Sequence, residues 1–221
     1  MPRPRRLPTV LTRPEVTALL ARANPRYLTG HRDRCLMQLM LHAGMRAAEV
    51  LALTVYDVDW LSGQLTVRQG KGKKDRILWL NETLLEDLRR WRARRPASPT
   101  GLLFPTRKGT PVYSAALRAM VKRRGRKAGL GHKDVHPHML QHTCATELYR
   151  QAKDIRLVQK ALGHADLRTT MIYTHIVDAD LDAALKGLHV REGPPAMGAH
   201  LLSQGDLPGR QVARQRHTSL S

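Results

Sequence analysis

Apolar residues recur along this chain mainly at the three- and four-residue spacing that is typical of helices. Thr12 and Glu15 have the positions of a capping box and predict a helix from there to about residue 23. Asn81 is a predicted cap for another helix, in which Leu84, Leu88 and Trp91 repeat at helical spacing. Further helices are predicted over 32–42, 47–53, 114–128, 138–151, 155–162, 167–174 and 179–188.

The period changes between residues 65 and 80. Leu65 and Val67 alternate with polar residues, and a second short apolar run covers 77–80. Between the two runs lies GKGKKD, a turn with two glycines, so this region predicts a β-hairpin. The expected fold class is therefore mainly α with one small antiparallel hairpin, an α+β fold. Residues 191–221 are rich in Gly, Pro, Ser and Gln without an apolar period, and they predict a disordered tail.

Composition adds a strong charge. The 221 residues include 38 Lys and Arg against 18 Asp and Glu, a formal net charge of +20. Such an excess favours a polyanionic partner, because each neutralised phosphate releases a condensed counterion. One Phe, five Tyr and three Trp supply few stacking surfaces for single strands or RNA, so duplex DNA fits better. Without a membrane-length apolar run, a secretory signal or a disulfide framework, the sequence predicts a cytoplasmic protein.

Several polar residues have both a chemical and an ordinary interpretation. Arg46 follows a glycine break at a helix start, where its guanidinium can bind a phosphate, or it is one more surface arginine. Lys71 either enters a groove from the hairpin turn or is a solvated basic residue there. His138 and His142 are four apart on a helix, but no Glu follows the first His as in zinc proteases, so no metal site is expected. Tyr173 can be a nucleophile or a core aromatic.

Taken in order, these motifs resemble the tyrosine recombinase (phage integrase) family. The matching elements are GMRAAEV, GKG about 25 residues later, HPHMLQHT, LGH, and IYTH nine residues after that histidine. The opening RLPTVLTRPEV is similar to that of integron-integrase and chromosome-dimer-resolution members, and the resemblance covers about residues 7–188. It implies a basic N-terminal extension at 1–10, a catalytic domain over 11–190 with the family's fold, and no N-terminal core-binding domain.

The resemblance implies a role for each motif. Tyr173 would attack the scissile phosphate of DNA and form a 3′-phosphotyrosyl link. Arg46 would clamp a non-bridging oxygen, and Glu49 would orient this region. Lys71 would protonate the departing 5′ oxygen. Because the covalent link conserves the bond energy, neither a metal nor a cofactor is implied.

Other residues complete the implied site. His138 and His164 would hydrogen-bond the phosphate or assist proton transfer. The segment 179–188 resembles the C-terminal helix that family members dock onto a neighbouring protomer, which implies a homotetramer on paired DNA sites; packing against its own chain is the alternative. The residues expected to contact DNA are Lys73, Lys74, Arg76 and Arg168.

Gln141 departs from the family pattern. The pattern is His-x-x-Arg-His, and its alignment with HMLQH places the arginine at Gln141. The amide carries no charge and cannot form the bidentate fork of arginine, and losing one such donor costs about 10²–10³ in rate. Lys133 and Arg150 are candidate replacement cations. The expected protein is a site-specific DNA recombinase, of a kind found on mobile elements, with reduced or abolished cleavage. The alternative is a cleavage-deficient DNA-binding relative or a fragment.

Overall fold

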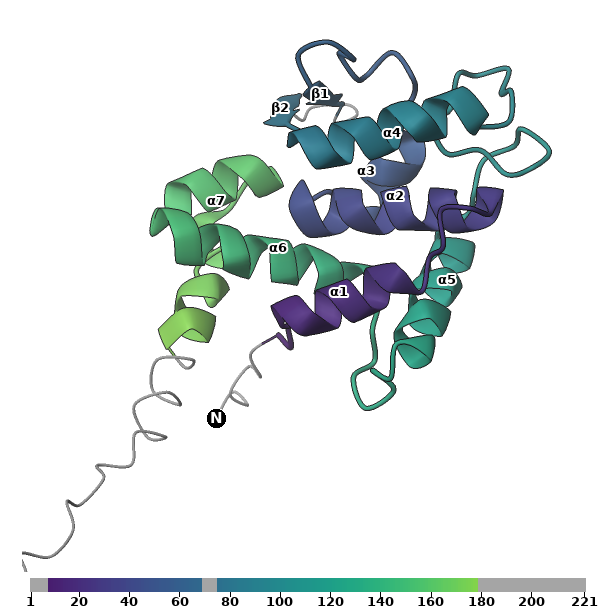
Figure 1. Cartoon of the computed structure of the whole chain (residues 1–221). Coiled ribbons are helices and arrows are strands. Elements are labelled where there is room, and N and C mark those ends of the chain that lie inside the picture. The colour runs from purple at the N-terminus through teal and green to yellow at the C-terminus, as the bar shows by residue number, and fades with distance from the viewer. Residues whose placement is uncertain (1–7, 69–74, 179–221) are drawn as a thin grey trace, which may run out of the picture. The chain divides into compact units, whose positions relative to one another are not determined.

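Helices with a single β-hairpin at one edge make up the part of the chain that the computed structural model describes, residues 8–68 and 75–178 (Figure 1). Residues 172–178 are helical as well, after the last labelled element. The mainly helical fold class is confirmed, while the predicted helix at 179–188 and the predicted tail lie outside the described residues. The elements are α1 (Arg13–Ala21), α2 (Leu28–His42), α3 (Ala47–Ala52), β1 (Gln64–Val67), β2 (Arg76–Trp79), α4 (Glu82–Arg94), α5 (Ser114–Lys127), α6 (Pro137–Ala152), α7 (Ile155–Leu162) and the 3-10 helix η1 (Leu167–Thr169).

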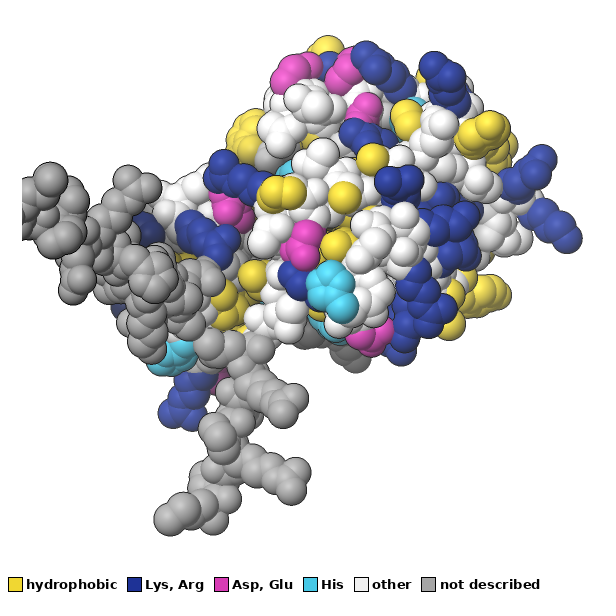
Figure 2. Space-filling model, turned by 60° about the horizontal axis from the view of Figure 1, so that its bottom comes forward, with side chains coloured by type: hydrophobic (Ala, Val, Ile, Leu, Met, Phe, Trp, Pro, Cys, Tyr) yellow, Lys and Arg dark blue, Asp and Glu magenta, His cyan; other side chains and the backbone are white. Residues whose placement is uncertain are grey.

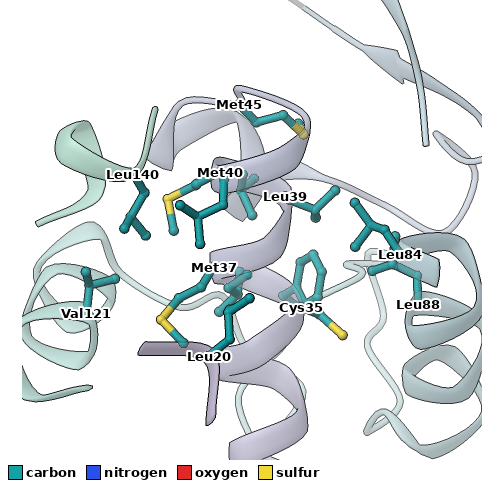
Figure 3. Packing of buried hydrophobic residues seen from close by; sticks show 14 of the residues in the cluster. Leu20, Cys35, Met37, Leu39, Met40, Met45, Leu84, Leu88, Val121 and Leu140 are labelled. Carbon is teal, nitrogen blue, oxygen red and sulfur yellow. The ribbon is translucent and has the colours of Figure 1, made fainter. Parts of the chain in front are cut away.

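Helix α2 is the centre of the main hydrophobic core. It packs against α4 on one side and α6 on another, and Figure 1 shows it between these two helices. Its residues 35–41 are all buried, as expected for a helix covered on every side. Met37, Met40 and Leu140 of α6 lie in the same cluster (Figure 3). In the described part of the chain, no helix is both long and apolar enough to cross a membrane.

Local signals determine the ends of several elements. The Thr12 side chain accepts a hydrogen bond from the Glu15 backbone, and the Glu15 carboxylate accepts one from Thr12, which confirms the capping box of α1. The Asn81 side chain accepts a hydrogen bond from the backbone of Leu84 and caps α4. Strands β1 and β2 pair antiparallel, with Gln64 opposite Trp79, which confirms the hairpin.

The helix expected over 167–174 is replaced by two shorter pieces. The side chain of Asp166 accepts a hydrogen bond from the backbone of Arg168 and starts η1, which ends at Thr169. A new helix begins at residue 172. The interruption falls on Thr170 and Met171, directly after Thr169, and threonine has a lower helix propensity than straight-chain residues. Thr170 is also buried and bonded to His164, so this turn lies beside a predicted site residue.

Candidate active site

Arg46 lies at the N-cap of α3, in an ion-pair network centred on Glu49. The Glu49 carboxylate accepts a hydrogen bond from the Arg46 backbone at 2.8 Å and another from its Nη1 at 2.8 Å. Both terminal nitrogens of Arg76 donate to the same carboxylate at 2.8 Å. Burial alone would raise the pKa of Glu49, but hydrogen bonds from Arg76 and Arg46 lower it below its usual value. Glu49 is therefore ionised and orients Arg46, as the predicted supporting role requires.

The turn before Arg46 depends on glycine. Gly44 has a φ of +63°, and a Cβ there would lie 2.9 Å from a methyl carbon of Leu162. The carbonyl of Gly44 accepts a hydrogen bond of 2.9 Å from Nε2 of Gln141. Gln141 is buried, 6% exposed, so its amide donates to the protein backbone at the predicted position of the second arginine. In this structure the Gln141 side chain connects α6 to the Gly44 turn by a hydrogen bond.

Tyr173 lies inside a small second cluster of apolar residues. Its side chain is 1% exposed and packs with Ala145, Val158 and Leu162. Its hydroxyl is 3.0 Å from Nδ1 of His142. Burial raises the pKa of Tyr173 to about 12, and the positive charge of Arg46 opposes this increase.

His164 lies directly after Gly163, at the end of α7. Gly163 ends α7 in the left-handed conformation, and its carbonyl accepts a hydrogen bond of 3.2 Å from Nη2 of Arg46. Nδ1 of His164 is 3.1 Å from the hydroxyl oxygen of Thr170. Burial lowers the pKa of His164 first, and the nearby positive charges of Arg46 and Arg76 lower it further. The neutral imidazole is therefore favoured at neutral pH.

His138 occupies the first turn of α6 and is exposed. It lines an open groove together with Ala47, Ser114 and Arg118. His136 caps α6 by accepting a hydrogen bond from the backbone of Met139, a structural role that agrees with assigning the site position to His138. The positive charge of His138 contributes to lowering the pKa of His142.

The remaining predicted residues fall in different places. Arg76 differs from the prediction that it contacts DNA: it is 9% exposed, its guanidinium is bonded to Glu49, and its Nε donates to the carbonyl of Ala161 at 2.9 Å. Arg168 is exposed on η1. The lysines Lys71, Lys73 and Lys74 lie outside the described residues.

The two candidate replacement cations are bonded to carboxylates at other positions. Nζ of Lys133 lies 2.7 Å from Glu15 at the start of α1. Arg150 lies 3.6 Å from Glu147 on α6. Neither pair includes Arg46, His164 or Tyr173, so these ion pairs do not bring a replacement cation to Gln141.

Sequence reasoning missed two features. His142 was weighed only as a metal ligand, although it is the last histidine of the His-x-x-Arg-His pattern. The second feature is the basic face of α5, whose sequence SAALRAMVKRRGRK contains six Lys and Arg and no acid. Among the described residues, four of these are exposed and make no ion pair; Figure 2 shows Lys and Arg side chains gathered mainly on the right of the face it presents. The four are Arg118, Arg123, Arg126 and Lys127.

Comparisons with known proteins identify the family. The model of the phage integrase family matches residues 9–180. The chain is 36% identical over 192 residues to the tyrosine recombinase XerD of Staphylococcus saprophyticus. It is 37% identical over 188 residues to the tyrosine recombinase XerC of Xanthomonas axonopodis pv. citri. Each match covers 85% of this chain but 64% and 61% of the relatives, so the chain spans less than two thirds of their length.

Solved structures extend the likeness to the fold. The crystal structure of XerA recombinase is similar with a TM-score of 0.72 and 31% identity, covering 85% of this chain and 68% of that one. XerH recombinase bound to a palindromic difH substrate, in a post-cleavage complex, is similar with a TM-score of 0.72 and 34% identity, covering 82% and 54%. The chain therefore belongs to the phage integrase family and contains the catalytic domain of a tyrosine recombinase.

Proposed function

We propose that this chain acts on duplex DNA as a site-specific strand transferase in which Tyr173 is the nucleophile, and that Gln141 strongly reduces its cleavage. The observation that carries the proposal is that Arg46 and Tyr173 both contact the end of α7 beside His164: Arg46 bonds to the carbonyl of Gly163, and Tyr173 packs with Leu162. A guanidinium beside a phenol and a neutral imidazole is suited to phosphoryl transfer. Arg46 stabilises the charge that develops on the phosphate, and the imidazole supplies a hydrogen bond.

The chemical step follows from these groups. The phenolic oxygen of Tyr173 forms a bond to phosphorus while the bond from phosphorus to the 5′ oxygen breaks. The phenolic proton passes to solvent water, and the departing oxygen receives a proton from Lys71, whose role rests on the family motif alone. Because Tyr173 is 1% exposed, DNA must uncover its hydroxyl before attack. The energy of the broken ester is kept in the phosphotyrosyl bond, so rejoining needs no further energy source.

Gln141 is the reason to expect slow cleavage. Its amide already donates to Gly44, so it brings no charge to the transition state. Removing a single donor of this type costs about 10²–10³ in rate, and removing a full charge that faces the phosphate costs more. The second candidate function, DNA binding without cleavage, is favoured by this one observation.

Covalent capture distinguishes the two functions. Because the target site is unidentified, the probe is a pool of duplexes of randomised sequence with a nick in one strand, and adducts that survive denaturation are counted and sequenced. The chain is compared with Gln141→Arg and with Tyr173→Phe, which keeps the ring but removes the nucleophile. We expect at least about a 10²-fold gain in adduct for Gln141→Arg and none for Tyr173→Phe. Equal adduct from the unchanged chain and Gln141→Arg would contradict the role assigned to Gln141.

The exposed basic face of α5 is the best-supported DNA-contacting surface. Arg118 lies on this face and lines the groove that also contains His138, so the face continues into the site. Basic side chains of this kind bind phosphates, and their binding weakens with salt. We expect weak duplex binding that falls steeply between 50 and 200 mM salt, on the order of the 10³-fold decrease typical of several phosphate-binding side chains.

Fluorescence anisotropy of a labelled duplex tests the α5 surface. Replacing Arg118 and Arg126 together by alanine is expected to reduce the salt slope by about 2, one for each phosphate that is no longer neutralised. Arg90→Ala is the matched control, because Arg90 is exposed on α4 and paired with Glu86. An unchanged slope in the double variant would exclude this surface. Assembly into a homotetramer through 179–188 stays a prediction.

A further inference from the structure

A hydrogen bond joins the predicted nucleophile to a residue outside the catalytic set that the family motifs imply. The Tyr173 hydroxyl and Nδ1 of His142 are 3.0 Å apart, and their ring centroids are separated by 5.8 Å. We propose that His142 is the positioning residue of this site: its neutral imidazole accepts a hydrogen bond from the Tyr173 hydroxyl and fixes the direction of the nucleophile. The proposal rests on the proposed function, because Tyr173 is a nucleophile only there.

Both partners of this hydrogen bond are held by packing. His142 lies in the middle of α6 between two residues that bind other segments. Gln141 donates to Gly44, and the hydroxyl of Thr143 accepts a hydrogen bond of 3.0 Å from the backbone of Leu11. On the other side, the Tyr173 ring is enclosed by the small apolar cluster around Val158. Because each ring is fixed by its own neighbours, the bond sets the position of a reactive atom, which a solvated side chain cannot do.

The electrostatic surroundings of His142 keep it uncharged. Burial lowers the pKa of His142 to about 4, and the neighbouring histidines His138, His136 and His164 contribute to this decrease. The neutral ring with its proton on Nε2 offers Nδ1 as an acceptor. The pKa of Tyr173 is about 12, far above that of His142, so the proton stays on the phenol. His142 therefore orients a neutral phenol and does not remove its proton in this arrangement.

A metal site does not explain His142. Its Nδ1 is engaged by Tyr173, and His138, four residues earlier, is exposed. Among the described residues, no three His, Cys, Asp or Glu side chains gather in a group that could hold a metal ion. The remaining ordinary explanation is a core hydrogen bond that only stabilises the fold, and the tests are designed against it.

The first test measures the pair without any DNA. Nitrogen NMR of the full chain reports which imidazole nitrogen of His142 is an acceptor, with His142→Asn used to assign its signals. We expect neutral His142 with an Nε2 proton at pH 7, and a changed Nδ1 signal in Tyr173→Phe, which removes only the hydroxyl. An unchanged Nδ1 signal in Tyr173→Phe would overturn the proposal even if the site never cleaves DNA.

The second test separates positioning from proton removal and from stability. In the Gln141→Arg chain, adduct formation is measured for His142→Asn and His142→Phe. The Asn amide oxygen lies one bond from Cγ, as Nδ1 does, so it keeps an acceptor but cannot act as a base. We expect Asn to retain the rate within about tenfold and Phe to lower it about 10²-fold, because misplacing a reacting atom by about 1 Å costs that much.

The outcomes are distinct. Equal decreases in His142→Asn and His142→Phe would identify proton removal and overturn positioning. A retained rate in His142→Phe would also overturn positioning, because Phe has no acceptor. Unfolding midpoints of both variants show whether a lower rate comes from a weakened fold. If it does, the variant with the lower rate will also have the lower midpoint. Absence of any Tyr173-dependent adduct in the Gln141→Arg chain itself would defeat the proposed function, while the NMR test would still decide the role of His142.

Discussion

The candidate site has two sides with opposite chemistry, an ionic wall and a neutral wall. One wall, formed by Arg46, Glu49 and Arg76, is fully ionic, and its guanidinium groups are held by Glu49 and by backbone carbonyls. The other wall, formed by Gln141, His142 and Tyr173, is uncharged and held by single hydrogen bonds. The two arginines differ in exposure: 33% of the Arg46 side chain is accessible against 8% for Arg76, so Arg46 is the one that a phosphate can reach.

The largest expected effect is on the ionic wall. Glu49→Gln leaves Arg76 with a buried charge and no carboxylate partner. Breaking a buried pair by removing one member costs about 3–5 kcal/mol of folding free energy. Urea unfolding measures this decrease. The control is Glu86→Gln, whose ion pair with Arg90 is exposed and should contribute about 0–1 kcal/mol. Similar decreases in both variants would show that the buried network adds no special stability.

A smaller effect is expected on the neutral wall. Gln141→Met has a similar volume but leaves the buried carbonyl of Gly44 without the Nε2 donor. An unsatisfied buried acceptor costs about 1–3 kcal/mol, again measured by urea unfolding. The matched control is Gln151→Met on the same helix, where Gln151 is exposed and bonded to Glu147. If Gln141→Met were as stable as the unchanged chain, the hydrogen bond from Gln141 to Gly44 would contribute nothing to the free energy of unfolding.

The same division explains what the sequence reveals. Elements with local signals were predictable: the capping box at Thr12, the cap at Asn81 and the hairpin each depend on residues within a few positions. The motif order predicted Arg46, His164 and Tyr173 as site residues. In the structure, Arg46 bonds to Gly163 beside His164, and Tyr173 packs with Leu162 of the same helix end. What each of them does in a reaction stays a prediction.

Pairings between distant segments were not predictable. Gln141 and Gly44 are 97 residues apart, and Glu49 and Arg76 are 27 apart, so nothing in the local pattern pairs them. Arg76 alternates with Ile77 on β2 and shares the inward face with buried Leu78, so its burial was readable from the period of two. The pairing of Arg76 with Glu49 was not readable, and Arg76 was therefore expected to contact DNA.

The smallest expected effect is a pH dependence of stability on the neutral wall. The pKa of His142 is lowered from 6.5 to about 4 in the folded chain, so between these values the unfolded chain binds more protons there. The stability from neutral His142 is complete above pH 6.5 and is lost as the pH falls towards 4. Because the side chain is partly exposed, this contribution is discounted for solvent screening to about 1–2 kcal/mol.

His142→Asn isolates this contribution. Other histidines with lowered pKa values, His31, His42, His136 and His164, also weaken the fold in acid, but they do so in both chains. Urea unfolding at pH 7.5 and pH 5 should therefore show a smaller decrease in stability in acid for His142→Asn than for the unchanged chain. An equal decrease in the variant would mean that folding leaves the pKa of His142 unchanged, and a larger decrease would mean that folding raises it towards neutral pH. The neutral wall would then carry a second positive charge beside Tyr173, and the contrast between the two walls would fail.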